Sequence, residues 1–260
     1  MTMKIVAWAF TALVALAASA HAATCSSTGG AFETWKKEFA AEARANGVGS
    51  RGISALLGTS YSTGTIRADR NQHSFKLSLA QFMSKRGAAA IIARGKKQKA
   101  ANAALFATLE KRYGVPAGPL IAIWGMETAF GASTGNQNTI SAVATLAYDC
   151  RRTDYFTEQL YAALKLIDKG VLSAATRGAM HGEVGQTQFL PKNILLYGAD
   201  GDGGGINLNG KADALASTAK FLNDQGWPAG GPYQAGSFAT WNAATVYQKA
   251  LAIIASKIDE

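Results

Sequence analysis

Apolar residues recur at intervals of three and four along most of the chain, the spacing that places them on one face of an α-helix. The first such segment carries Phe32, Trp35 and Phe39 and stops at Gly47. One further apolar helix is expected after the polar loop that begins at Gly131. The other segments predicted to be helical are 52–60, 74–87, 88–114, 115–131, 153–170, 211–226 and 238–258.

Two segments break the helical pattern. Residues 61–72 are polar and irregular, and residues 174–210 are rich in glycine. Any small sheet is expected in the second of these segments or near residues 230–238. The sequence has no internal repeat and no low-complexity linker. The pattern predicts a mainly α fold with one glycine-rich irregular segment, of the kind that commonly carries function.

The first 23 residues have the features of a secretory signal peptide. Lys4 gives a basic start, residues 5–18 are apolar, and Ala20 and Ala22 are the small residues that precede a cleavage site. The alternative is a membrane anchor, which needs about 18–20 apolar residues, more than this run contains. We expect residues 1–23 to be removed and residues 24–260 to be exported, without stable insertion in a membrane.

Two cysteines, Cys25 and Cys150, remain after the predicted cleavage. In an oxidising compartment an even number of cysteines favours a disulfide, which here would join the new N-terminus to the middle of the chain. Two buried free thiols are the alternative.

Basic residues outnumber acidic ones, 26 to 17, for a formal net charge of +9. The densest cluster lies at residues 94–99 and is interpreted as a solvated helix face, or as a general attraction to an acidic polymer. No aromatic residues interleave with this cluster and no nucleic-acid signature is present, which argues against nucleic acid as a partner. Outside the cytoplasm, wall polymers and membrane surfaces are the acidic partners that remain.

One acid stands alone in an almost wholly apolar segment, "IAIWGMETAFG", residues 121–131. On a helix, Glu127 shares its face with Ile123 and Trp124 one turn before and with Phe130 one turn after. Desolvation raises the pKa of a carboxyl group, so such a residue keeps a proton to donate near neutral pH. A glutamic acid beside a tryptophan is also the arrangement of the general acid of lysozyme. The alternative is a side chain that points into solvent.

The motifs that surround this acid resemble those of one family. "IWGMETAFG", "AVATLAYDCRRTDYFTEQL", "GEVGQTQFLP" and "DGDGGGINL" with "ADALASTAKFL" occur in the order found in the membrane-bound lytic transglycosylase B family of peptidoglycan-cleaving enzymes. The segment "DRNQHSFKLSLAQF" resembles the N-terminal region of that family. The resemblance implies an α+β, lysozyme-like fold and a periplasmic location. An N-terminal helical part would span about residues 30–113 and a catalytic core about residues 114–260.

The resemblance also implies the reaction. The substrate would be the glycan strand of peptidoglycan, cut between N-acetylmuramic acid and N-acetylglucosamine. Glu127 occupies the family's "ET-x-x-G" position. It would protonate the glycosidic oxygen and then take the proton of the muramic C6 hydroxyl, which closes a 1,6-anhydro ring. No second carboxylate and no cofactor is needed, because the substrate supplies its own nucleophile.

Substrate-binding residues are expected where the chain matches the family's sugar- and peptide-contacting segments, or offers an amide to sugar hydroxyls. These are Arg151, Arg152, Tyr155, Gln186, Gln188, Phe189 and Tyr247. The chain departs from the family at Gln248, where an asparagine is usual, at Ala179, near which a serine is usual, and at Glu183, where residues are small. Glu183 is expected to be an exposed loop residue bonded to backbone amides.

The glycine-rich loop at residues 198–210 resembles the calcium loop of some family members. Asp200 and Asp202 match two ligand positions of an EF-hand, but Gly204 and Lys211 occupy two others, so a turn without metal is predicted. The two histidines beyond the signal peptide, His73 and His181, make no zinc spacing.

Two other functions stay open. One is a muramidase that hydrolyses with water, which becomes feasible if Glu183 reaches the neighbourhood of Glu127. The other is a non-catalytic protein that binds or organises peptidoglycan through a retained sugar groove.

Overall fold

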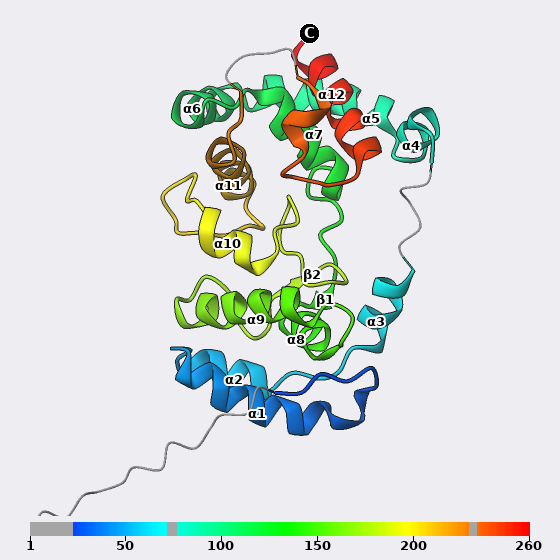
Figure 1. Cartoon of the computed structure of the whole chain (residues 1–260). Coiled ribbons are helices and arrows are strands. Elements are labelled where there is room, and N and C mark those ends of the chain that lie inside the picture. Colours follow the sequence, from blue (N-terminus) through cyan, green and yellow to red (C-terminus); the bar gives the residue numbers. More distant parts are fainter. Residues whose placement is uncertain (1–22, 72–76, 229–232) are drawn as a thin grey trace, which may run out of the picture.

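The computed structural model describes residues 23–71, 77–228 and 233–260, and within them the chain forms twelve α-helices and one small sheet (Figure 1). Most of the predicted signal peptide, residues 1–22, lies outside the described residues. The helices are α1 (Phe32–Ala45), α2 (Ser50–Leu57), α3 (Thr63–Arg70), α4 (Leu79–Lys85), α5 (Ala88–Ala101), α6 (Ala103–Tyr113), α7 (Ala117–Thr128), α8 (Thr139–Tyr148), α9 (Thr153–Asp168), α10 (Pro191–Tyr197), α11 (Lys211–Asp224) and α12 (Thr245–Asp259). Two short 3₁₀ helices span Gly29–Ala31 and Ala235–Phe238. The predicted mainly α fold is confirmed.

The helix predictions were wrong at several places, and the helix expected over residues 238–258 begins only at Thr245. The segment predicted to be irregular contains α3, because the Ser62 hydroxyl caps it by accepting a bond from the Thr65 backbone, and a polar residue, Asp69, is buried on its inner face. The single helix predicted for residues 88–114 is two helices. Asn102 leaves helical geometry between α5 and α6, and its side chain binds the Lys211 ammonium.

The helices form two groups that face each other (Figure 1). Helices α1, α2 and α3 pack with α8 and α9, whereas α4, α5 and α6 pack around α7 and α12. Helix α10 bridges α9 and α11 between the groups. Each group contains helices from before and from after residue 114. The two groups are therefore not the N-terminal part, 30–113, and the catalytic core, 114–260, that the sequence suggested.

Helix α7 is the central helix of the second group. It is apolar on all sides and nearly every residue in it is buried, as expected for a helix enclosed by others. Gly125 permits one of these close contacts, since a Cβ there would lie 2.5 Å from the Ile91 side chain on α5. The helix ends after Thr128, where Ala129 and Phe130 adopt positive φ angles. The expected continuation of the helix to Gly131 was therefore wrong by one turn.

The small sheet joins the loop before α8 to the start of the glycine-rich segment 174–210. Strand β1 (Gln137–Asn138) pairs antiparallel with β2 (Arg177–Gly178). One strand thus lies in the segment where a sheet was expected, and its partner precedes α8. After β2 the chain folds back so tightly that a Cβ on Gly178 would come within 1.9 Å of the Glu183 carbonyl oxygen. This turn fixes the residues that follow it, 183–190.

The disulfide between Cys25 and Cys150 is confirmed, with Cα atoms 5.1 Å apart. Beside it, the Ser26 backbone donates to the Tyr148 carbonyl at 3.0 Å, so the first described residues are attached to the end of α8. No described helix combines the length and apolarity that a bilayer-spanning segment requires.

Candidate active site

A cleft with a volume of about 660 Å³ contains Glu127 in its lining. Its walls come from α9, the 183–190 loop, α10, α11, the end of α7 and residues 240–242. The volume lies in the range of pockets that hold small ligands or a few sugar units. The end of α7 is anchored to the loop wall, since the Thr128 hydroxyl donates to the Gln186 carbonyl at 2.6 Å.

The Glu127 carboxyl group is held by two aromatic donors. The Tyr247 hydroxyl donates to Glu127 Oε1 at 2.5 Å, and the Trp241 indole N–H donates to the same oxygen at 3.1 Å. Both donors lie more than a hundred residues further along the chain, on α12 and just before it. The carboxyl group therefore has a fixed orientation at the cleft wall, rather than pointing into open solvent.

Burial raises the pKa of Glu127 above its ordinary value. This effect outweighs the bonds from Tyr247 and Trp241 and the positive charge of Arg86, all of which lower the pKa. The negative charge of Glu183 adds a smaller increase. Glu127 is thus disposed to carry a proton, and the two donors stabilise the carboxylate once the proton has left.

Tyr247 itself stays protonated. Burial, followed by the charge of Glu127 and the bond to it, raises the pKa of the Tyr247 hydroxyl well above its usual range. The Arg86 guanidinium lies 5.9 Å from the centre of the Tyr247 ring. Tyr247 had been selected as a substrate contact, but its ring is buried and its hydroxyl binds the candidate acid.

Trp241 was missed by the sequence reasoning. Its indole reaches Glu127, and its ring packs against Phe189 with centroids 5.6 Å apart. Its only signal in the sequence is its place six residues before Tyr247, and this spacing does not reveal a partner on a distant helix.

Gln188 and Phe189 both line the cleft. Gln188 adopts a positive φ of 59°, and its side-chain amide donates to the Gly185 carbonyl at 2.9 Å. Phe189 is 2% exposed and packs edge-on against the Trp241 ring, so it shapes the cleft more than it presents an open surface.

Of the two predicted substrate contacts Tyr155 and Gln186, only Tyr155 lines the cleft. Tyr155 lines the cleft with about half of its surface exposed, so its ring is available to a ligand. Gln186 is not in the lining. Its side chain accepts a bond from the Trp124 indole at 2.8 Å and donates to the Asn209 carbonyl at 2.6 Å, and it therefore holds α7 against the loop.

Arg151 and Arg152 lie outside the described lining of the cleft and bind Asp69 of α3. Arg151 Nε donates to Asp69 Oδ2 at 2.6 Å, and the Arg152 guanidinium binds the other oxygen. Burial acts to raise the pKa of Asp69, but the bonds and charges of the two arginines lower it below its usual range. Both guanidinium groups remain partly exposed, so their expected contact with a peptide stem stays a prediction.

Glu183 is not an exposed loop residue. It lines the same cleft as Glu127, with its side chain 24% exposed. The expected bond to a backbone amide is present, since the His181 N–H donates to Glu183 Oε2 at 3.0 Å. His181 Nδ1 lies 3.2 Å from the other carboxylate oxygen.

Comparison with known proteins assigns the chain to a family. Residues 31–245 match the family model described as Transglycosylase SLT domain. The chain belongs to this family. The resemblance to the lytic transglycosylase B family is thereby confirmed.

Relatives of this transglycosylase domain include membrane-bound lytic murein transglycosylase B of Escherichia coli (strain K12), 34% identical over 121 residues, or 45% of this chain and 34% of that protein. SltB3 from Pseudomonas aeruginosa, solved in complex with NAG-anhNAM-pentapeptide, is 36% identical with a TM-score of 0.73. The match covers 79% of this chain and 56% of SltB3. The chain thus spans about a third of the first relative's length and just over half of the second's.

The fold is also shared with the lytic transglycosylase Slt35 from Escherichia coli, solved in complex with bulgecin A. The TM-score is 0.77 at 18% identity, over 86% of this chain and 92% of that one. This likeness confirms the expected lysozyme-like transglycosylase fold.

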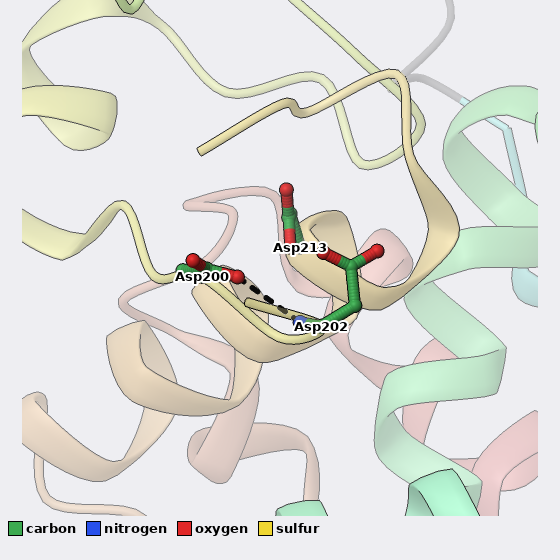
Figure 2. Close-up of side chains that lie close together, drawn as sticks. All are labelled: Asp200, Asp202 and Asp213. Atoms are coloured by element: carbon green, nitrogen blue, oxygen red, sulfur yellow. Dashed lines mark hydrogen bonds between the residues drawn. The ribbon is translucent and has the colours of Figure 1, made fainter. Parts of the chain in front are cut away.

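Slt35 has also been solved in complex with calcium. In this chain three aspartates, two from the glycine-rich loop and one from α11, lie close together (Figure 2). Asp200, Asp202 and Asp213 each bring one carboxylate oxygen within 4.8 Å of the others. Asp213, on the first turn of α11, was missed because it lies beyond the loop positions of an EF-hand template.

This set does not fit calcium well. Calcium takes about six to eight oxygens, commonly with a bidentate glutamate at the twelfth loop position, which is Lys211 here. The oxygens present already accept backbone donors: Asp213 binds the N–H groups of Gly201 and Asn207, each at 2.7 Å. The backbone amides of Gly205, Gly203 and Asp202 lower the pKa of Asp200. The loop is therefore stabilised by its own hydrogen bonds.

Calcium is expected to change the unfolding temperature by less than about 2 °C, measured by calorimetry in 1 mM calcium chloride against 1 mM EDTA. A resident ion at a hundred times its Kd would add about 2.7 kcal/mol and raise the temperature by several degrees. A large increase that disappears in Asp202→Ala, an exposed position, would contradict this expectation.

Proposed function

We propose that the protein is a lytic transglycosylase that cleaves the glycan strands of peptidoglycan between N-acetylmuramic acid and N-acetylglucosamine. The observation that carries the proposal is a carboxyl group with a raised pKa, held by two aromatic donors in the wall of a cleft. Family membership and the likeness to SltB3, which was solved with NAG-anhNAM-pentapeptide, support the choice of substrate.

Glu127 acts twice in this reaction. As general acid it transfers its proton to the glycosidic oxygen while the bond from that oxygen to C1 of the muramic acid breaks. As general base the resulting carboxylate takes the proton of the C6 hydroxyl, whose oxygen bonds to C1 of the same sugar. Glu127 ends protonated, the 1,6-anhydro ring is closed and no water is consumed.

Two physical effects lower the barrier. Tyr247 and Trp241 donate to the carboxylate while it is charged, which stabilises it between the two proton transfers. The attacking hydroxyl is part of the bound sugar, so it reacts at a high effective molarity. Gln188 and Tyr155 in the lining would position the sugar, through an amide and a ring face.

Hydrolysis with water is the second candidate, and the presence of Glu183 in the same cleft favours it. The third sequence-based candidate, a non-catalytic peptidoglycan-binding protein, gains no such observation.

The products distinguish the first two candidates. Purified peptidoglycan digested by the protein is expected to give anhydromuramic ends, each lighter by one water than a hydrolytic end in mass spectrometry. Borohydride should leave these ends unchanged but should reduce hydrolytic ends, which gain two hydrogens. Products that are reducible throughout would overturn the proposal in favour of a muramidase.

The periplasm is the proposed location, in line with the signal-like sequence of residues 1–23 and with bacterial relatives that act on murein. Without Lys4 of the predicted signal peptide, 25 basic and 17 acidic residues leave a formal net charge of +8, which suits a protein that binds an acidic polymer.

A further inference from the structure

We propose that Glu183 is a second catalytic residue, an ionised carboxylate that stabilises the positive charge on C1 of the muramic acid while Glu127 delivers its proton. This inference rests on the proposed function and adds to it a residue that the family's single-acid mechanism does not include.

The first argument is position. Glu183 and Glu127 line one cleft, although they come from a loop and from the end of α7. The loop is fixed on both sides of Glu183. The Ala179 backbone donates to the Glu183 carbonyl at 2.8 Å, and Val184 pairs with Phe189 in an antiparallel bridge. The carboxylate is thus held in place before a substrate arrives.

The second argument is the ionisation of the group. Both oxygens of Glu183 face donors on His181, the backbone N–H at 3.0 Å and the ring Nδ1 at 3.2 Å. A carboxylate without a proton requires Nδ1 to carry the hydrogen of that bond. Burial acts to raise the pKa of Glu183, but the bonds and charge of His181 lower it below the ordinary value. Glu127 shifts in the opposite direction. Two neighbouring carboxyl groups with opposite pKa shifts are typical of an acid and a charged partner.

The third argument is the charge within the cleft. Among the described lining residues the one basic side chain is Lys192, and its ammonium binds Glu158 at 2.5 Å. Lys192 is therefore paired with Glu158 and not with Glu183, whose ring partner is His181. Cleavage of a glycosidic bond passes through an oxocarbenium-like state with positive charge near C1. A fixed anion in a partly desolvated cleft stabilises that state more than the uncharged ground state.

The test compares Glu183→Gln with wild type and with Glu38→Gln, which removes the same charge from an exposed position on α1. Glutamine keeps the size of the side chain and removes the charge. We expect kcat to fall about 100-fold, as for loss of one electrostatic stabiliser, with KM changed less than about threefold. The products that remain should still carry anhydro ends.

The pH profile separates this role from a structural one. Among the described residues, the titratable and charged groups beside the two acids are Arg86 and Tyr247 for Glu127, and His181 and Tyr155 for Glu183. Glu158 and Lys192 line the same cleft. Loss of the Glu183 charge lowers the pKa of Glu127. Glu127 then loses its proton at lower pH, so the alkaline limb of the kcat profile should move to lower pH in Glu183→Gln and should not move in Glu38→Gln.

A second variant keeps the inference testable if Glu183→Gln folds poorly. His181→Ala removes the imidazole donor, which raises the pKa of Glu183. The acid limb of the profile should then move to higher pH. The inference is overturned if the profiles of both variants coincide with that of wild type, or if Glu183→Gln loses rate without movement of the alkaline limb. Wild-type products with hydrolytic ends would instead overturn the proposed function, and Glu183 would become the candidate base for water.

Discussion

Replacement of Glu127 by glutamine is expected to lower the rate of glycan cleavage by about 1000-fold or more. Glutamine keeps the shape of the side chain, and its carbonyl oxygen still accepts the bonds from Tyr247 and Trp241. It has no acidic proton, so neither proton transfer of the proposed reaction takes place. The measurement is release of soluble fragments from purified peptidoglycan, quantified by chromatography.

A binding assay distinguishes a variant that has lost only the reaction from a variant that has lost its fold. The Glu127→Gln protein should still sediment with insoluble peptidoglycan, and its unfolding temperature should not decrease, because a carboxyl group that burial disfavours has been removed. Glu38→Gln, at an exposed position on α1, is the matched control and should digest at the wild-type rate. Continued digestion by Glu127→Gln would show that the acid has been assigned to the wrong residue.

Loss of the disulfide is expected to reduce the free energy of unfolding by about 2–5 kcal/mol. The bond between Cys25 and Cys150 closes a loop with a sequence separation of 125 residues, and a long loop restricts the unfolded chain strongly. The measurement is urea unfolding of the mature protein and of the double variant Cys25→Ser, Cys150→Ser.

Wild type unfolded in the presence of a reductant is the control for this variant. It should reproduce the midpoint of the double variant, because both lack the same covalent bond. If reduction leaves the midpoint unchanged, the bond does not form in the folded protein or does not restrict its unfolded state.

The sequence was sufficient to find the acid, but not its partners. Glu127 could be recognised from its neighbouring residues alone, because an acid inside an otherwise apolar helix is rare. Its two donors, Trp241 and Tyr247, reach it through the packing of α12 against α7, which no periodicity encodes. Tyr247 was selected only through a family motif, and for a different contact.

The positions of the amide and basic residues depended equally on distant contacts. Gln186 and Gln188 are two residues apart and chemically identical, yet the first binds Trp124 and the second lines the cleft. Arg151 and Arg152 were expected near the substrate, and their partner Asp69 lay in a segment predicted to be irregular. Helix α3 has only eight residues, and its stability depends on its cap and on tertiary contacts. Its sequence therefore shows no apolar periodicity from which a helix could be predicted.

The place of Glu127 along α7 has a consequence for turnover. It is the penultimate residue of the helix, where the aligned peptide dipoles present their negative pole. That pole disfavours an anion by about 0.3–1 kcal/mol, so the deprotonated enzyme is under a continuous electrical bias to recover its hydrogen. The end of α7 thus favours the second proton transfer of the proposed reaction, in which Glu127 takes the proton of the C6 hydroxyl.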